Sequence, residues 1–219
     1  MKKGKILLVL MVIANLSVHG QLPHENPKYG PDSASRMECA KNLSTMSEFV
    51  KIKLFDRAYD SWLYCFNNCP SASKNIYLYG AKILKHKIEN TSDEAEKQKL
   101  VEKLMALYDQ RMEHYKQEGY VLGIKGIDLL RYDKGRVQDG YDLLKQSVEK
   151  SKAKSLDAVL VTFIQTSYML YVNEIITAEE FADNYFMDVK FLEQKLTRKK
   201  SAQTEKAMET VEKIFMDSK

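Results

Sequence analysis

The chain has 219 residues, of which 44% are hydrophobic and 29% are charged, and it contains only nine glycines and four prolines. This composition is typical of a globular, mainly helical protein and excludes collagen-like and low-complexity sequences. The formal net charge of +4 includes Lys2, Lys3 and Lys5, and without these three lysines 31 basic residues stand against 30 acidic ones. Such a balance excludes the broad basic field that binds nucleic acid, so we expect no nucleic-acid partner.

The first twenty residues have the pattern of a secretory signal peptide. Three lysines precede an apolar run from Ile6 to Ile13, and Val18 and Gly20 place small residues before a cleavage point. The apolar run is too short to cross a bilayer as a stable anchor. We therefore expect residues 1–20 to be removed, leaving a periplasmic or secreted protein that does not span the membrane.

After this segment the sequence predicts a flexible arm and then helices. Three of the four prolines, Pro23, Pro27 and Pro31, fall within 21–34, which favours an extended or disordered arm. From 35 to 219 apolar residues recur at helical spacing, and Ser35, Thr91 and Thr177 are each followed three places later by glutamate, the pattern of a capping box. The predicted helices lie near 36–51, 55–69, 73–90, 93–117, 121–132, 136–150, 155–172, 178–197 and 201–216.

The short turns between these nine helices predict antiparallel neighbours. Consecutive hairpins then stack into an all-α solenoid, in which neighbouring units bury surface that no single unit buries alone. The last helix carries an apolar stripe of Met208, Val211 and Phe215. This stripe either caps the stack within the chain or forms a hydrophobic surface for a second chain.

The first predicted hairpin has a recognisable motif. An aromatic, a small residue, an aromatic, a small residue and a proline occur in the order Phe49, Ala58, Trp62, Cys65 and Pro70. These positions resemble the tetratricopeptide repeat, in which the small residue lets the two helices approach and the aromatics fill the space between them. The opening of the motif departs from the family, because Asn42 stands where an aromatic is usual and Met46 where a glycine is usual.

The resemblance extends to the whole chain through the signal peptide and two further segments, 68–75 and 108–111. With these features the chain is similar to a group of exported tetratricopeptide proteins from Bacteroidota. The resemblance implies a right-handed superhelix, a periplasmic or envelope location and no established catalysis.

The three cysteines predict one disulfide in an exported protein. Cys39 lies in the first turn of the first predicted helix and Cys69 in the last turn of the second, and antiparallel packing brings these ends together. Cys65 lies one turn before Cys69 and could compete for Cys39, but it occupies the small-residue position of the motif. We therefore expect a Cys39–Cys69 bond and a buried free thiol at Cys65.

The sequence favours a protein without catalysis, cofactor or metal. Outside the signal peptide only His24, His86 and His114 are available, and none lies in a recognisable nucleophile, metal-binding or phosphate-loop motif. The cysteine spacing also matches no common zinc site. We interpret the basic run Arg198-Lys199-Lys200 as a helix C-terminus complement rather than a polyanion site.

A binding surface is the remaining functional hypothesis. Tyrosine and arginine are good anchors for a bound peptide, and we predict groove residues at Tyr79, Lys82, Arg111 and Lys125. The predicted function is a scaffold that binds an envelope or periplasmic protein or peptide. The alternative is a protein that binds a glycan or a cell-wall fragment through its tyrosine-rich surface.

Overall fold

The computed structural model describes residues 25–218 and contains nine α-helices and no strand in that range, which confirms the predicted all-α fold. The predicted signal peptide lies outside the described residues. Each predicted helix has a counterpart whose ends differ from the prediction by at most three residues. The helices are α1 (Ser33–Lys51), α2 (Phe55–Asn68), α3 (Asn75–Asn90), α4 (Glu94–Tyr115), α5 (Glu118–Tyr132), α6 (Val137–Ser151), α7 (Asp157–Val172), α8 (Ala178–Arg198) and α9 (Ala202–Met216).

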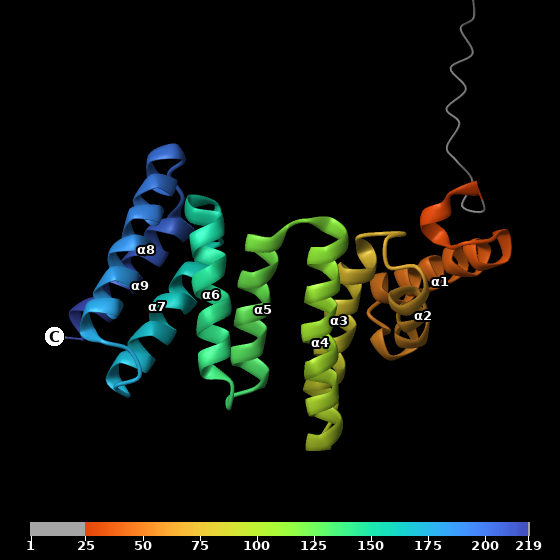
Figure 1. The fold of residues 1–219 in the computed structure, drawn as a ribbon, viewed down its shortest axis with the longest axis horizontal. Coiled ribbons are helices and arrows are strands. Elements are labelled where there is room, and N and C mark those ends of the chain that lie inside the picture. The colour runs from red at the N-terminus through yellow and green to blue at the C-terminus, as the bar shows by residue number, and fades with distance from the viewer. Residues whose placement is uncertain (1–24, 219) are drawn as a thin grey trace, which may run out of the picture.

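The helices follow one another in a row, with α1 and α2 at one end and α8 and α9 at the other (Figure 1). Every helix packs on its neighbour in the chain, and α1 also contacts α3, α5 contacts α7, and α7 contacts α9. Contacts between alternate helices are expected where helix hairpins are stacked side by side. The packing is therefore consistent with a helical repeat, while the right-handed superhelix stays a prediction.

Two of the three predicted helix caps are wrong. Helix α1 is capped by Asp32, whose carboxylate accepts from the Ser35 backbone N–H at 2.9 Å, so the helix starts before the predicted cap. Helix α4 is capped by Asp93 instead of Thr91. In both places an aspartate beside the hydroxyl residue takes over, because a carboxylate is the stronger acceptor at the positive end of a helix. Thr177 does cap α8, through the Glu180 backbone N–H.

The predicted flexible arm is folded in its described part, 25–34. A short 3-10 helix, η2 (Pro27–Tyr29), precedes α1, and the Tyr29 ring packs against the hydrophobic core. Arg36 of α1 donates from Nε to the backbone oxygen of Gly30 at 2.7 Å. Pro27 and Pro31 therefore lie in a segment that is held on α1, and an extended arm does not describe residues 25–34.

The motif residues of the first hairpin form its core. Ala58, Trp62 and Cys65 are fully buried, Phe49 packs against the same N-terminal core, and Pro70 follows the end of α2. The Trp62 indole reaches beyond its own hairpin and donates its N–H to the backbone oxygen of Ile76 on α3 at 2.9 Å. This bond satisfies the only polar atom of the buried ring and joins the first hairpin to the second.

A disulfide closes the same hairpin. The sulfur atoms of Cys39 on α1 and Cys69 at the C-cap of α2 lie 2.07 Å apart, and this is the pair predicted from the sequence. By the loop-entropy model, closing a loop of about thirty residues stabilises the fold by about 3–4 kcal/mol. Cys65 is a buried free thiol, and burial raises its pKa to about 12, so it stays protonated and unreactive at neutral pH.

The C-terminal half has its own hydrophobic core, which includes the last helix. Helix α9 packs against α7 and α8, with Val211 fully buried. Met208 and Phe215 are partly buried, and the Phe215 ring stacks on Tyr185 with ring centroids 3.9 Å apart. The apolar stripe of α9 therefore caps the stack within the chain, which is one of the two alternatives predicted from the sequence.

We predict that Gly80→Ala lowers the free energy of unfolding by about 1–3 kcal/mol, because it overpacks the core between the first two hairpins. A Cβ at Gly80 would lie 2.1 Å from Nε1 of Trp62 and 2.6 Å from Cδ1 of Leu107. Urea unfolding measures the change. The matched control is Gly135→Ala, where the nearest atom lies 3.4 Å away and a change within about 0.5 kcal/mol is expected. Equal stability of the two variants would contradict the prediction.

Candidate binding surface

Three of the four predicted groove residues lie at the surface of α3 and α5. Tyr79 is half-buried on α3, and Lys82 one turn later is exposed, with its Nζ 5.8 Å from the centre of the Tyr79 ring. Lys125 on α5 forms an ion pair with Asp109 of α4, with Nζ and Oδ1 2.5 Å apart. Tyr79 and Lys82 are therefore adjacent, while Lys125 is held by its neighbour.

The fourth predicted residue, Arg111, is not a surface residue. Its exposed fraction is 4%, and its Nη2 donates to Oε1 of Gln117 at 3.1 Å. Burial lowers the pKa of its guanidinium, although the nearby hydroxyls of Tyr120 and Tyr108 oppose this effect. Arg111 continues the core-facing stripe of α4, since it lies three residues after Tyr108. Helical spacing alone indicates a core position for Arg111, whereas its basic side chain suggested a surface position.

A buried carboxylate that sequence reasoning missed joins three helices. Asp128 of α5 has an exposed fraction of 3% and accepts a short hydrogen bond from the Tyr108 hydroxyl of α4. Lys85 of α3 pairs with the same oxygen at 2.6 Å. Burial and the adjacent carboxylate raise the pKa of Tyr108, so its hydroxyl remains a donor. Asp128 is therefore compensated by a hydroxyl donor and by a lysine that is itself only partly exposed.

A second set of polar contacts joins α3 to α5 at the surface. The Tyr132 hydroxyl donates to Oε1 of Glu89 at 2.6 Å, and Arg131 pairs with the same oxygen at 3.0 Å. Glu89 and Tyr132 are 43 residues apart, and the Lys85–Asp128 pair has the same separation. A constant offset means that α3 and α5 run parallel, and long side chains bridge the space between them. We call the surface between them the α3–α5 seam.

The α3–α5 seam ends in an open hollow of about 400 Å³. Its wall combines two partly or fully buried side chains, Ile88 and Tyr132, with three basic residues at the edge. The lining residues are Ile88, Glu89, Thr91, Lys97, Arg131, Tyr132 and Lys134. Five of the seven lining residues are polar or charged, so the hollow offers charged groups around one partly exposed aromatic ring.

A second hollow, of about 380 Å³, lies between α6 and α8. Its polar wall is organised by Glu180, which accepts from the Tyr141 hydroxyl at 2.9 Å and from Lys145 Nζ at 2.8 Å. Asn184 donates to the Tyr141 hydroxyl at 2.8 Å. The bonds from Lys145 and Tyr141 lower the pKa of Glu180 and keep it ionised. These contacts explain why Glu180 does not return to complete the predicted capping box.

No part of 25–218 contains three His, Cys, Asp or Glu side chains grouped so that they could hold a metal ion. Within the same residues, no helix is both long and apolar enough to cross a bilayer. No protein-family model matches the chain, and neither a curated protein nor a solved structure matches it.

Asp188 of α8 is a buried carboxyl group that lacks hydrogen-bond partners for its oxygens among the described residues. Its exposed fraction is 0%. Burial raises the pKa of Asp188 well above its usual value, because the charged form loses its hydration. The folded chain therefore holds a proton there over a pH range in which the unfolded chain has released it.

We predict that Asp128→Asn lowers the free energy of unfolding by about 1–3 kcal/mol, because the Lys85 ammonium loses its counterion in a partly buried site. The control is Asp139→Asn, which removes the charge of a carboxylate that is 54% exposed and is paired with Arg136, whose side chain is 37% exposed. Exposed pairs contribute less than about 1 kcal/mol. Urea unfolding at neutral pH compares the two, and equal losses would contradict the prediction.

We predict that Asp188 makes the folded state less stable as pH rises. The folded pKa is raised, so the folded chain binds more protons than the unfolded chain above about pH 4, and the free energy of unfolding falls from there to the raised pKa. Asp188→Asn removes this slope, and the wild type should lose at least about 1.4 kcal/mol relative to the variant between pH 4 and 7, the equivalent of one pKa unit.

Urea midpoints across that pH range test the prediction. Asp183→Asn on the exposed side of the same helix is the matched control and should keep the wild-type slope. Parallel stability profiles for the wild type and Asp188→Asn would show that Asp188 ionises normally in the folded state.

Proposed function

We propose that this chain is a non-catalytic interaction scaffold that binds a segment of a partner protein along the α3–α5 seam. The observation that carries the proposal is the buried contact of Lys85 and Tyr108 with Asp128. This contact holds two helices that are not consecutive in the chain, α3 and α5, in one relative position. A surface built from both helices is therefore preorganised, which lowers the entropy lost on binding.

The chemistry of the seam favours a peptide with acidic and apolar side chains. Lys82 and Lys134 are exposed and form no ion pair with any described residue, so their charges are available to a partner. The partly exposed Tyr132 gives the hollow an aromatic surface beside Lys134, and Lys82 lies further along α3. A basic edge around apolar surface is the arrangement that suits an acidic segment laid against helices.

The glycan alternative is less well supported by this surface. A sugar is bound best by an exposed aromatic face flanked by carboxylates and amides. The Tyr132 ring is only partly exposed, and its hydroxyl and the adjacent carboxylate of Glu89 are already bonded to each other. We therefore favour the peptide.

The proposed setting is the cell envelope. Residues 1–20 have a signal-peptide pattern, and structural disulfides occur mainly in proteins of oxidising compartments. Both features support export to the periplasm or beyond, with an envelope protein as the partner. The resemblance to exported tetratricopeptide proteins of Bacteroidota supports the same proposal.

In-cell crosslinking followed by capture and mass spectrometry tests the function. Lys82→Glu combined with Lys134→Glu should reduce the yield of the main crosslinked protein at least tenfold, because two attractive charges become repulsive. The matched control reverses two exposed lysines of α9, Lys206→Glu and Lys213→Glu, and should retain the crosslink. Circular dichroism checks that both variants are folded.

Two results would contradict the scaffold on this surface. Equal crosslinking by both double variants would place the partner elsewhere on the molecule. Capture of a glycan that survives protease treatment, with no protein crosslink, would favour the glycan alternative.

A further inference from the structure

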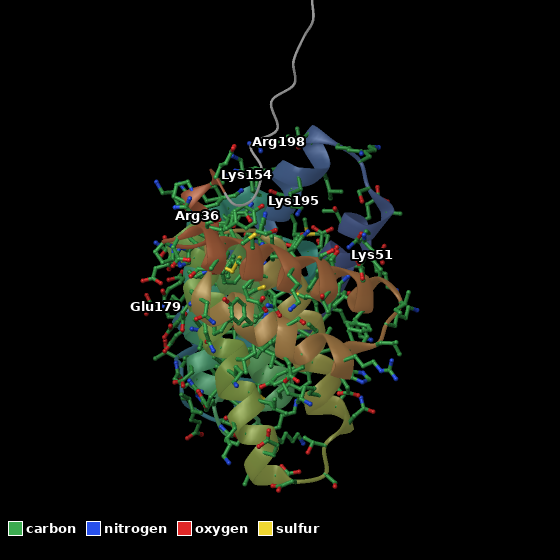
Figure 2. The ribbon with its side chains drawn as sticks, turned by 90° about the vertical axis from the view of Figure 1, so that its right-hand side faces the viewer. Arg36, Lys51, Lys154, Glu179, Lys195 and Arg198 are labelled. Carbon is green, nitrogen blue, oxygen red and sulfur yellow. A yellow bond between two sulfur atoms is a disulfide. The ribbon has the colours of Figure 1, made fainter. Side chains whose placement is uncertain are left out.

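A second surface, separate from the α3–α5 seam, concentrates positive charge where α6 and α8 end. An open hollow of about 300 Å³ lies there, beside the 3-10 helix η3 (Lys152–Lys154). Figure 2 shows Lys154, Lys195 and Arg198 together at this end of the molecule, with Glu179 far from them at the other end of α8. The lining residues are Lys150, Ser151, Lys152, Ala153, Lys154, Gln194 and Arg198.

Two of the cations near this hollow have partners within the fold. Lys150 pairs with Glu118 at 3.2 Å. Lys195 pairs with Asp157 at 2.6 Å and donates to the Ser155 backbone oxygen. Lys150 joins α6 to α5 and Lys195 joins α8 to α7, so these two lysines do not count as free charge.

The remaining cations are free. Lys152, Lys154, Arg198, Lys199 and Lys200 form no ion pair with any residue in 25–218, and all five are exposed. The C-terminus of a helix carries about half a negative charge, so the two helix ends at this surface together carry about one negative charge. Five positive charges are more than is needed to balance it. The interpretation of Arg198-Lys199-Lys200 as a helix complement therefore accounts for only a small part of the charge.

An exposed apolar side chain lies close to Lys154 in the chain. Leu156 follows Lys154 by two residues, in the loop before α7, and its exposed fraction is 40%. A leucine beside several lysines is the combination found on surfaces that bind membranes, where the apolar side chain enters the interface and the cations contact lipid phosphates. A small soluble anion has no apolar surface that could contact Leu156.

We propose that this basic hollow, with Leu156 beside it, binds the phosphate groups of anionic lipid headgroups at a membrane surface. The five free cations contact the headgroups, and the loop that carries Leu156 lies at the lipid interface. Each cation near an anionic surface strengthens binding by about fivefold, so several weak contacts together hold the chain on the membrane. The α3–α5 seam plays no part in this contact.

Co-sedimentation with lipid vesicles tests the proposal, using protein purified from its native cells so that its N-terminus is the natural one. The wild type should bind vesicles that contain phosphatidylglycerol and not vesicles of phosphatidylcholine alone, and salt should weaken the binding. Lys154→Glu combined with Arg198→Glu should reduce binding at least tenfold. Leu156→Ser should reduce it severalfold.

The matched control is again Lys206→Glu with Lys213→Glu, which changes the net charge by the same amount on α9 and should reduce binding less than twofold. An equal loss in the control would show that net charge, not the hollow, is responsible. Failure of the wild type to bind phosphatidylglycerol vesicles would overturn the proposal. Full competition by millimolar inorganic phosphate would also overturn it, since the hollow would then take a soluble anion.

Discussion

Three helices of this protein meet at one buried carboxylate. Asp128 accepts from Tyr108 and pairs with Lys85, so α4, α3 and α5 each contribute one side chain to a contact that excludes most water. A buried charge is tolerated only where its partners are correctly placed, because an unpaired one costs several kcal/mol. The offset between α3 and α5 is therefore set at this point, and the surface contacts of Glu89 follow the same offset.

The position of α5 also decides how the two halves of the chain are joined. Val121 and Leu129 belong to the N-terminal core, while Ile127 and Leu130 pack against the C-terminal core. On its second side α5 lies very close to α6, since a Cβ on Gly126 would be 3.1 Å from the Gly140 oxygen. Helix α5 thus contributes side chains to both hydrophobic cores and joins the half that carries α3 to the half that carries the basic hollow.

Helix ends explain part of the distribution of charge over the molecule. Acidic residues such as Glu179 occupy the first turn of α8 and basic residues such as Arg198 its last turn, which complements the helix dipole. Where the C-termini of α6 and α8 come together, their cations gather at one place. A chain that is nearly neutral after residue 20 therefore presents a strongly basic surface, and its composition gives no sign of this.

The sequence by itself determined the helices, because apolar spacing acts within a few residues, and Arg111 also lies on the core-facing spacing of α4. The cap residues were a weaker guide, since only Thr177 of the three predicted caps is the cap that the structure has. The sequence also indicated the Cys39–Cys69 pair, since adjacent antiparallel helices bring those ends together. Only the tertiary structure decided which charges are buried and which are free. Lys85 and Asp128 meet through the angle and offset at which helices stack, and those depend on the packing of many side chains at once, which no local pattern contains.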